Sequence, residues 1–291
     1  MNNPFRVAVT GANGQLGRLV IEALASRLPP GGVVALVRDP AHLSAPFPDG
    51  VEIRQGDYGR PESLDIALKD VDRLLLISSN ALGARVAQHR NVIAAATQAG
   101  VKRLAYTSVL RADTSSLGLA EEHRQTEALI RASGLAYTLL RNGWYTENYA
   151  ASIPAALAHG ALLGAAGEGR ISSAARQDYA EAAAQAMIKD TGPQVVHELA
   201  GDASYTLTEF AAEIARQAGK PVAYAHMSEA DFRNALIGAG LPPPVADLLS
   251  NSDAAAAKGA LFDRSSQLSR LIGRPTTPFA ATIAQTLAAG G

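Results

Sequence analysis

Short apolar runs alternate with helical patterns through the first half of the chain. The runs are rich in valine, leucine and isoleucine, and several are apolar throughout, which is typical of strands buried on both faces of a parallel sheet. The predicted strands are Arg6–Thr10, Val33–Val37, Val51–Gln55, Arg73–Ser78, Arg103–Ser108 and Tyr137–Arg141. The predicted helices between them are Gln15–Leu28, Pro61–Leu68, Val86–Ala99 and Leu119–Ser133. This alternation predicts an α/β fold, a doubly wound Rossmann-type parallel sheet.

The alternation ends near residue 145, and this change predicts two domains. We expect a Rossmann domain over residues 1–150. A smaller, mostly helical lobe over residues 151–291 is expected to complete the substrate cleft, with some strands returning to the main sheet. The glycine-rich stretch Gly160–Gln177 is expected to be a loop, either a lid or an irregular connection.

Polar residues mark the helix starts of this second half. Asp178 is predicted to cap an alanine-rich helix that runs to about Lys189, and Val195–Leu199 reads as a further strand. Thr206 and Glu209 have the spacing of a capping box, in which each side chain satisfies the other's backbone N–H. Ser228 and Asp231 repeat this spacing more weakly.

A glycine-spaced turn follows the first predicted strand and opens the first predicted helix. A bound diphosphate needs backbone N–H groups and a helix N-terminus aimed at it without a side chain in the way. We expect the first glycine to allow the tight turn, the second the approach of the diphosphate, and the third the packing of helix on strand. The residues expected to bind the nucleotide here are Gly11, Ala12, Asn13, Gly14, Gln15, Leu16 and Gly17.

The ends of the second and third strands indicate which nucleotide binds. Arg38 comes first off the second strand, where an arginine pairs with the 2′-phosphate of NADP(H). Asp39 precedes Pro40 and is expected to be the N-cap of a helix. Arg38 therefore favours NADP(H), although a solvated surface charge would look the same. Asp57 is placed to meet the adenine amine or to cap a turn.

Two later segments are expected to border the nicotinamide. Ser78, Ser79 and Asn80 follow the fourth strand. The segment after the sixth strand contains the chain's only tryptophan, two tyrosines and several amides, the residue types that line a ligand pocket. Asn142, Trp144 and Tyr145 are predicted to line the substrate pocket, and the predicted cofactor clamp is Gly143, Trp144, Tyr145, Thr146, Glu147 and Asn148. The alternative is a buried aromatic anchor between the sheet and the second lobe.

No residue is identified as catalytic. Carbonyl-reducing short-chain dehydrogenases use a tyrosine with a lysine four residues later as their proton donor, and no tyrosine of this chain has such a lysine. A quinone needs less assistance, because aromatisation drives its reduction and its oxygens can take protons from water. Hydride transfer then requires mainly that the acceptor be stacked on the nicotinamide.

Composition narrows the choice of partners. The chain has 291 residues, a formal net charge of −1 and no concentrated basic block, so a nucleic-acid surface is not favoured. It has no cysteine, which excludes thiolate metal sites, and no metal is expected. No apolar run approaches the roughly 20 residues that span a bilayer, and the start resembles no signal peptide. We therefore expect a cytoplasmic protein, and the sequence leaves the oligomeric state open, a homodimer included.

Blocks spread over the whole chain resemble the NmrA-like branch of the atypical short-chain dehydrogenases. They are Thr10–Gly17, Ala35–Pro40, Gln55–Gly59, Leu74–Asn80, Gln88–Ile93, Ala105–Ser108, Tyr137–Tyr149, Gly164–Ile171, Asp178–Ala180 and Lys258–Asp263. The resemblance is strongest to the flavin-free quinone reductases of this branch. It implies NADPH-dependent reduction of quinones, with cofactor contacts at Gly11–Leu16, at Arg38, just after Ser79 and at Gly143–Asn148.

Two other functions stay open from the sequence. Some NmrA-like proteins bind the dinucleotide as redox sensors with little catalysis, and the missing tyrosine–lysine pair is compatible with that role. The triphenylmethane dye reductases share the scaffold, so reduction of triphenylmethane or azo dyes is a further alternative. A quinone or dye reductase is expected to bind a small flat acceptor beside NADP(H), whereas a redox sensor needs no acceptor.

Overall fold

The computed structural model contains a seven-stranded sheet in the order β3-β2-β1-β4-β5-β6-β8. The structure describes residues 5–189 and 192–290. The strands from β3 through β6 pair in parallel. The seven strands are β1 Val7–Val9, β2 Val33–Val37, β3 Glu52–Gln55, β4 Arg73–Leu76, β5 Arg103–Val109, β6 Ala136–Asn142 and β8 Gln194–Leu199.

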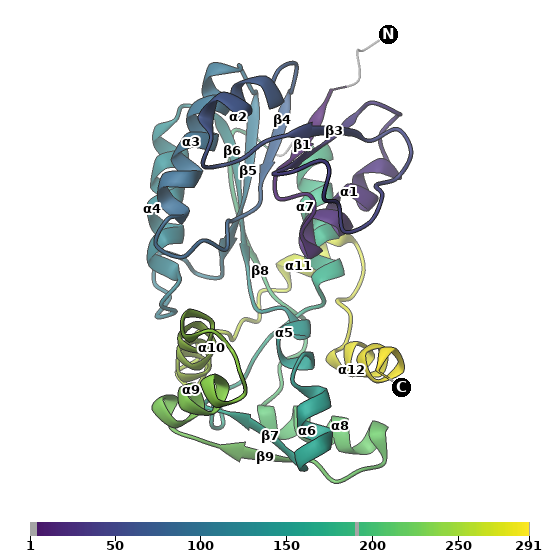
Figure 1. Cartoon of the computed structure of the whole chain (residues 1–291), viewed down its shortest axis with the longest axis vertical. Helices are drawn as coiled ribbons and strands as arrows, with labels where there is room; N and C mark the ends of the chain where they lie inside the picture. The colour runs from purple at the N-terminus through teal and green to yellow at the C-terminus, as the bar shows by residue number, and fades with distance from the viewer. Residues whose placement is uncertain (1–4, 190–191, 291) are drawn as a thin grey trace. The chain divides into compact units, whose positions relative to one another are not determined.

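Helices cover both faces of this sheet, as a parallel sheet with apolar side chains on both faces requires. Figure 1 shows α2, α3 and α4 on one face and α1 and α7 on the other. These helices are α1 Gln15–Ala25, α2 Pro61–Ala67, α3 Arg85–Gln98, α4 Ala120–Ala132 and α7 Arg176–Ile188. The core between sheet and helices includes Leu74, Leu104, Tyr106 and Leu139, which are fully buried. The α/β Rossmann-type fold is confirmed.

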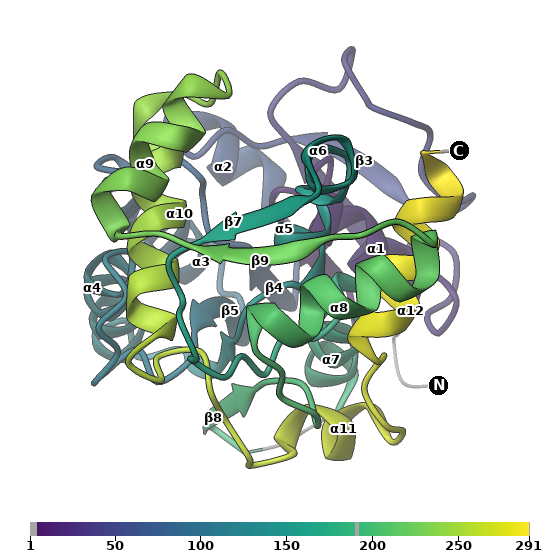
Figure 2. The same cartoon turned by 90° about the horizontal axis from the view of Figure 1, so that it is seen from below.

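The chain divides into two units. Unit 1 holds the described residues of 1–112, 121–142 and 179–197, and unit 2 those of 113–120, 143–178 and 198–291. Unit 2 contains a parallel two-stranded sheet of β7 Ala161–Gly164 and β9 Ala223–His226, which lie side by side in Figure 2. Its helices are α5 Thr146–Ala150, α6 Ile153–His159, α8 Leu207–Ala218, α9 Glu229–Gly238, α10 Pro243–Ala256, α11 Gln267–Ile272 and α12 Phe279–Ala289.

Most predicted elements are present with ends shifted by at most three residues. The capping box at the start of α8 is confirmed, because Glu209 N donates to Thr206 Oγ1 at 3.1 Å and Thr206 N to the Glu209 carboxylate at 2.8 Å. Ser228 also caps its helix, accepting from Asp231 N at 3.1 Å. No helix in the described ranges combines the length and apolarity of a membrane span.

Several predicted boundaries differ from the structure. The units do not separate at residue 150, because α7 and β8 bring residues 179–197 into unit 1 while residues 143–150 belong to unit 2. The stretch Gly160–Gln177 is not all loop, since it contains β7 and the start of α7. Both differences arise from elements whose partners are distant in the sequence.

Two predicted helix caps are wrong. No helix follows Asp39; its carboxylate instead accepts from Ala41 N at 2.9 Å and contacts His42 Nδ1 at 2.6 Å in an exposed turn. Asp178 lies inside α7, which begins two residues earlier. A short polar side chain can accept from N–H groups of a turn as well as from those of a helix start. The position of an aspartate in the sequence therefore does not distinguish a turn contact from a helix cap.

Candidate functional site: a nucleotide cradle and an aromatic segment

The turn after β1 has the backbone that a diphosphate site requires. Gly11 has φ +59, in the left-handed region that glycine adopts without a steric penalty. Helix α1 then begins at Gln15 behind Gly14, with no side-chain cap and no acidic residue in its first turn. Its first N–H groups are therefore available to an anion, and the helix dipole favours negative charge at this end.

The last glycine of the turn allows an unusually close backbone contact. A Cβ atom on Gly17 would lie 2.3 Å from the Gly11 carbonyl oxygen and 2.7 Å from the Cα of Ala12. Close packing by this glycine is confirmed, but its partner is the turn itself rather than the strand. The helix N-terminus is thus held against the backbone that would surround the phosphates.

Tyr58 joins three segments beneath this turn, a role that the sequence analysis did not predict. Its hydroxyl lies 2.8 Å from the Ile77 carbonyl oxygen and also within reach of Thr10 Oγ1. Thr10 Oγ1 in turn accepts from Ile77 N at 3.0 Å. The ends of β1 and β4 and the loop after β3 are therefore fixed to one another, and burial raises the pKa of the phenol, which stays protonated.

Arg18 fastens the loop after β2 to the glycine turn, and it too was missed. It donates to Asn13 Oδ1, Ser44 Oγ and the Ala45 carbonyl oxygen, each at 2.6 Å. Asn13 Oδ1 also accepts from Ser44 N at 3.0 Å. The spacing of Asn13 and Arg18, five residues apart across the start of a helix, is the only signal that the sequence offers.

Arg38, predicted to pair with the 2′-phosphate, and Asp57, predicted to meet adenine or cap a turn, follow neighbouring strands. Arg38 is exposed directly after β2, and its carbonyl oxygen accepts from Gln55 at 3.1 Å. Asp57 follows β3, and its Oδ1 accepts from Gly59 N at 2.9 Å. The turn-capping role of Asp57 is therefore present, and its contact with adenine stays a prediction.

Helix α3 fixes the loop Ser78–Asn80 after β4. Arg85 Nε donates to the Ser79 carbonyl oxygen at 2.6 Å, and Ser79 N donates to His89 Nε2 at 2.9 Å. His89 is fully buried, and burial, together with the charge of Arg85, lowers its pKa to about 3. It is therefore a neutral acceptor, and its hydrogen bond holds the loop backbone to α3.

A buried polar network occupies the other half of unit 1. Glu127 accepts from Ser108 Oγ at 2.6 Å and from Arg141 Nη2 at 2.8 Å. The Tyr106 hydroxyl and His123 Nδ1 are hydrogen-bonded at 2.7 Å, and both residues are buried. These groups are engaged with one another, an arrangement that positions β5, β6 and α4.

The aromatic segment after β6 lies in unit 2 and is held by that unit's own backbone. Gly143 N donates to the Leu199 carbonyl oxygen at 2.7 Å, and Thr146 N donates to that of Ala174 at 2.9 Å. Trp144 and Tyr149 are buried, with ring centroids 6.4 Å apart. Trp144 and Asn148 line a cavity within unit 2, whereas Tyr145 lies beneath the guanidinium of Arg176.

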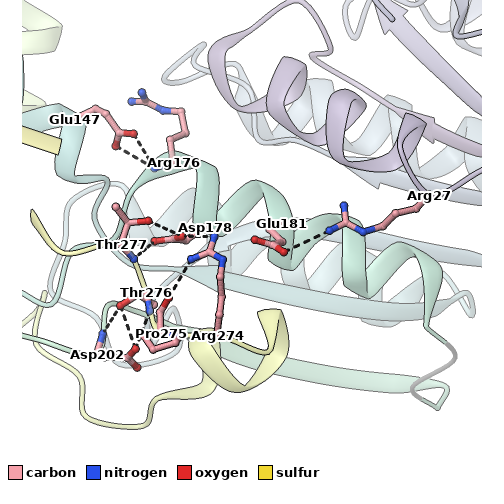
Figure 3. Close-up of polar contacts among 10 residues, drawn as sticks. All are labelled: Arg27, Glu147, Arg176, Asp178, Glu181, Asp202, Arg274, Pro275, Thr276 and Thr277. Atoms are coloured by element: carbon pink, nitrogen blue, oxygen red, sulfur yellow. Dashed lines mark hydrogen bonds and ion pairs between the residues drawn. The ribbon is translucent and has the colours of Figure 1, made fainter. Parts of the chain in front are cut away.

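Carboxylates organise the chain around this segment (Figure 3). Glu147 accepts from Arg176 N at 2.8 Å. Asp178 is fully buried and accepts from Thr277 N at 2.8 Å and from Arg274 Nη2 at 2.8 Å. These contacts hold the start of α7 to the loop before α12, which explains why Asp178 is polar without capping a helix.

The structure thus collects the predicted residues into two groups. Unit 1 holds the glycine turn, Arg38, Asp57, Ser78–Asn80 and, at the end of β6, Asn142. Unit 2 holds the clamp segment Gly143–Asn148. The described residues contain no group of three or more His, Cys, Asp or Glu side chains arranged to hold a metal ion.

Comparison with known proteins agrees with this geometry. Residues 11–190 match the profile of the NAD(P)H-binding family. Quinone oxidoreductase 2 of Escherichia coli is 55% identical over 277 residues, which are 95% of this chain and 97% of that protein.

Two solved structures are also closely similar. The NADPH complex of the E. coli NADPH-dependent quinone oxidoreductase superposes with a TM-score of 0.92 at 54% identity, covering 97% of this chain and 99% of that one. The triphenylmethane reductase of Citrobacter sp. gives a TM-score of 0.92 at 36% identity, with 98% and 100% covered. The chain therefore belongs to the NAD(P)H-binding family, in the group of Rossmann-type proteins that includes E. coli quinone oxidoreductase 2.

Proposed function

We propose that this protein is an NADPH-dependent quinone reductase that works without a flavin. The observation that carries the proposal is the 55% identity with quinone oxidoreductase 2 over nearly the full length of both chains. The turn Gly11–Gly17 and the start of α1 form the nucleotide cradle of unit 1. This cradle fits the cofactor, because Gly11 and Gly17 keep side chains away from an uncapped helix N-terminus. Bound NADPH supplies a hydride, and one proton from water completes the conversion of a quinone to a hydroquinone.

The residues of this chain bind and orient the reactants. The turn Gly11–Gly17 would hold the diphosphate through its N–H groups, and Arg38 would pair with the 2′-phosphate. Ser78–Asn80, kept in place by Arg85 and His89, would border the ribose and nicotinamide. Asn142 and the clamp Gly143–Asn148 are the further residues that we propose to contact the cofactor or the acceptor, and Trp144 would offer an aromatic surface to a flat acceptor.

Replacing Arg38 by alanine tests the cofactor assignment. Loss of a charge-assisted pair removes about 1.5–3 kcal/mol, so the Kd of NADPH should rise roughly 10- to 150-fold while that of NADH barely changes. Arg60→Ala is the matched control, since Arg60 is an exposed arginine that follows β3 and pairs with Glu62. An equal loss for NADPH and NADH would show that Arg38 does not face the 2′-phosphate.

Quinone turnover tests the activity itself. We expect oxidation of NADPH, followed at 340 nm, to depend on added quinone and to proceed without flavin. Tight binding of NADPH with negligible turnover over several quinones would instead favour a redox sensor, and unequal affinity for NADP and NADPH would strengthen that alternative.

A further inference from the structure

A cavity of about 220 Å³ lies entirely within unit 2. Its walls come from the aromatic segment after β6, from α6 and β7, and from α9 and α10. An apolar cavity of about 150 Å³ is large enough to bind benzene. The unit 2 cavity can therefore enclose a six-membered ring that carries substituents.

The walls are mainly aromatic and aliphatic. Trp144, Tyr149 and Phe232 line the cavity and are each less than a tenth exposed. The Trp144 and Tyr149 rings are inclined to each other by 50°, and aromatic side chains of this kind attract other aromatic rings. On α9, Ala235 and Leu236 complete the apolar surface.

A buried carboxyl group in this wall is hydrogen-bonded through both of its oxygens. Asp253 on α10 is 3% exposed. Its Oδ1 accepts from the Tyr149 hydroxyl at 2.9 Å, and its Oδ2 accepts from Ala165 N at 2.9 Å. Each oxygen therefore already accepts one hydrogen bond from the protein. The rest of the wall is mainly apolar, so the cavity is suited to an apolar group.

The cavity continues the segment proposed to clamp the cofactor. Trp144 and Asn148 belong both to that segment and to the cavity wall. We infer that the cavity receives a neutral aryl or branched alkyl substituent of the acceptor, and that Phe232, Ala235 and Leu236 of α9 limit its size. The inference rests on the proposed quinone reductase function and extends it by naming the class of acceptor, an apolar substituted quinone.

Direct binding tests the cavity without any turnover. Trp144 is the only tryptophan of the chain and lines the cavity, so tryptophan fluorescence reports on the cavity wall. Bromobenzene is a neutral aromatic probe whose heavy atom quenches tryptophan on contact. We expect saturable quenching in the wild-type protein. In Ala235→Phe, which fills the cavity, the affinity should fall at least fivefold.

Ala230→Phe is the matched control, because Ala230 is exposed on the same helix and does not line the cavity. The affinity of this variant for bromobenzene should stay within twofold of the wild type. Non-saturable quenching in the wild type, or equal losses in both variants, would overturn the inference whatever the enzymatic activity.

Kinetics then identify the ligand. The ratio of KM for phenyl-1,4-benzoquinone to KM for 1,4-benzoquinone should rise at least fivefold in Ala235→Phe and stay unchanged in Ala230→Phe. Leu236→Ala, which enlarges the cavity, should lower the ratio, so the prediction does not depend on one variant that folds poorly. Saturable bromobenzene binding without any quinone turnover would refute the proposed function and the quinone assignment together. Turnover with an unchanged ratio would refute the size limit alone.

Discussion

Asp253 gives the structure its sharpest pH dependence to test. The carboxyl lies in an apolar wall, and burial raises its pKa from 3.8 to about 6, against the opposing effect of its hydrogen bonds from Ala165 N and the Tyr149 hydroxyl. Asp253→Asn keeps the size and both contacts, because the amide oxygen can accept from Ala165 N while the amide nitrogen donates to the Tyr149 oxygen. The variant removes the ionisation, and the reversed hydrogen bond to Tyr149 contributes equally at every pH.

Proton linkage sets the direction in which the folding stability changes with pH. A carboxyl whose pKa is raised on folding favours the protonated folded state, so stability is highest below the unfolded value and is lost as the pH rises through about 6. A rise of roughly two pH units at about 1.4 kcal/mol each gives about 3 kcal/mol in total. Roughly 2 kcal/mol of this loss falls between about pH 4 and pH 8. The uncharged variant should lack that loss.

Urea unfolding at several pH values between 4 and 8 measures the effect as a difference between the variant and the wild type. That difference should grow in favour of Asp253→Asn as the pH rises, and then become constant above about pH 7. Asp247→Asn is the control, since Asp247 lies on the same helix with its side chain 54% exposed in an ion pair with Arg233. Parallel stability profiles for Asp253→Asn and the wild type would show that the cavity wall is more hydrated than its geometry indicates.

Two further substitutions test the local structure of each unit. Gly17→Ala should destabilise unit 1 by roughly 1–3 kcal/mol and weaken NADPH binding, because the new Cβ would lie 2.3 Å from a backbone oxygen; thermal unfolding checks this against Gly238→Ala, where a Cβ meets nothing within 4 Å. Thr206→Ala should cost about 1 kcal/mol through loss of the α8 cap, and Thr206→Ser should restore it; equal melting temperatures for the two variants would contradict the capping role.

The sheet of unit 1 was predictable because its signals are local. Strands β1 and β2 are short apolar runs, and both are buried at every position. The glycine turn was predictable for the same reason, since the strand, the turn and the helix follow one another within a few residues. Gly11 and Gly17 then show in φ and in close contacts what their spacing indicated.

The two strands of unit 2 were missed because β7 lies in a glycine-rich stretch and β9 has no core-strand pattern. β7 and β9 are four residues each, and both are only partly buried. Their pairing joins residues more than 60 positions apart in the sequence, for example Ala161 with Ala223. Nothing near either strand indicates the other, so their pairing is decided by the packing of unit 2.

Distance along the chain also explains which site residues were found and which were not. The nucleotide cradle is made by neighbours in sequence, but the contacts around it join separate segments. Tyr58 contacts Thr10 and Ile77. Arg18 binds Ser44 of the loop after β2, and His89 accepts from Ser79 N of the loop after β4. The cavity of unit 2 is the extreme case, since Tyr149 bonds to Asp253, 104 residues later. A site for a nucleotide that many proteins bind can thus be recognised from a local motif, because the site is built from the backbone of a few consecutive residues. A site that selects one acceptor from another is built from side chains on separate helices, and α9 and α10 give this enzyme a surface that can change while the cradle stays the same.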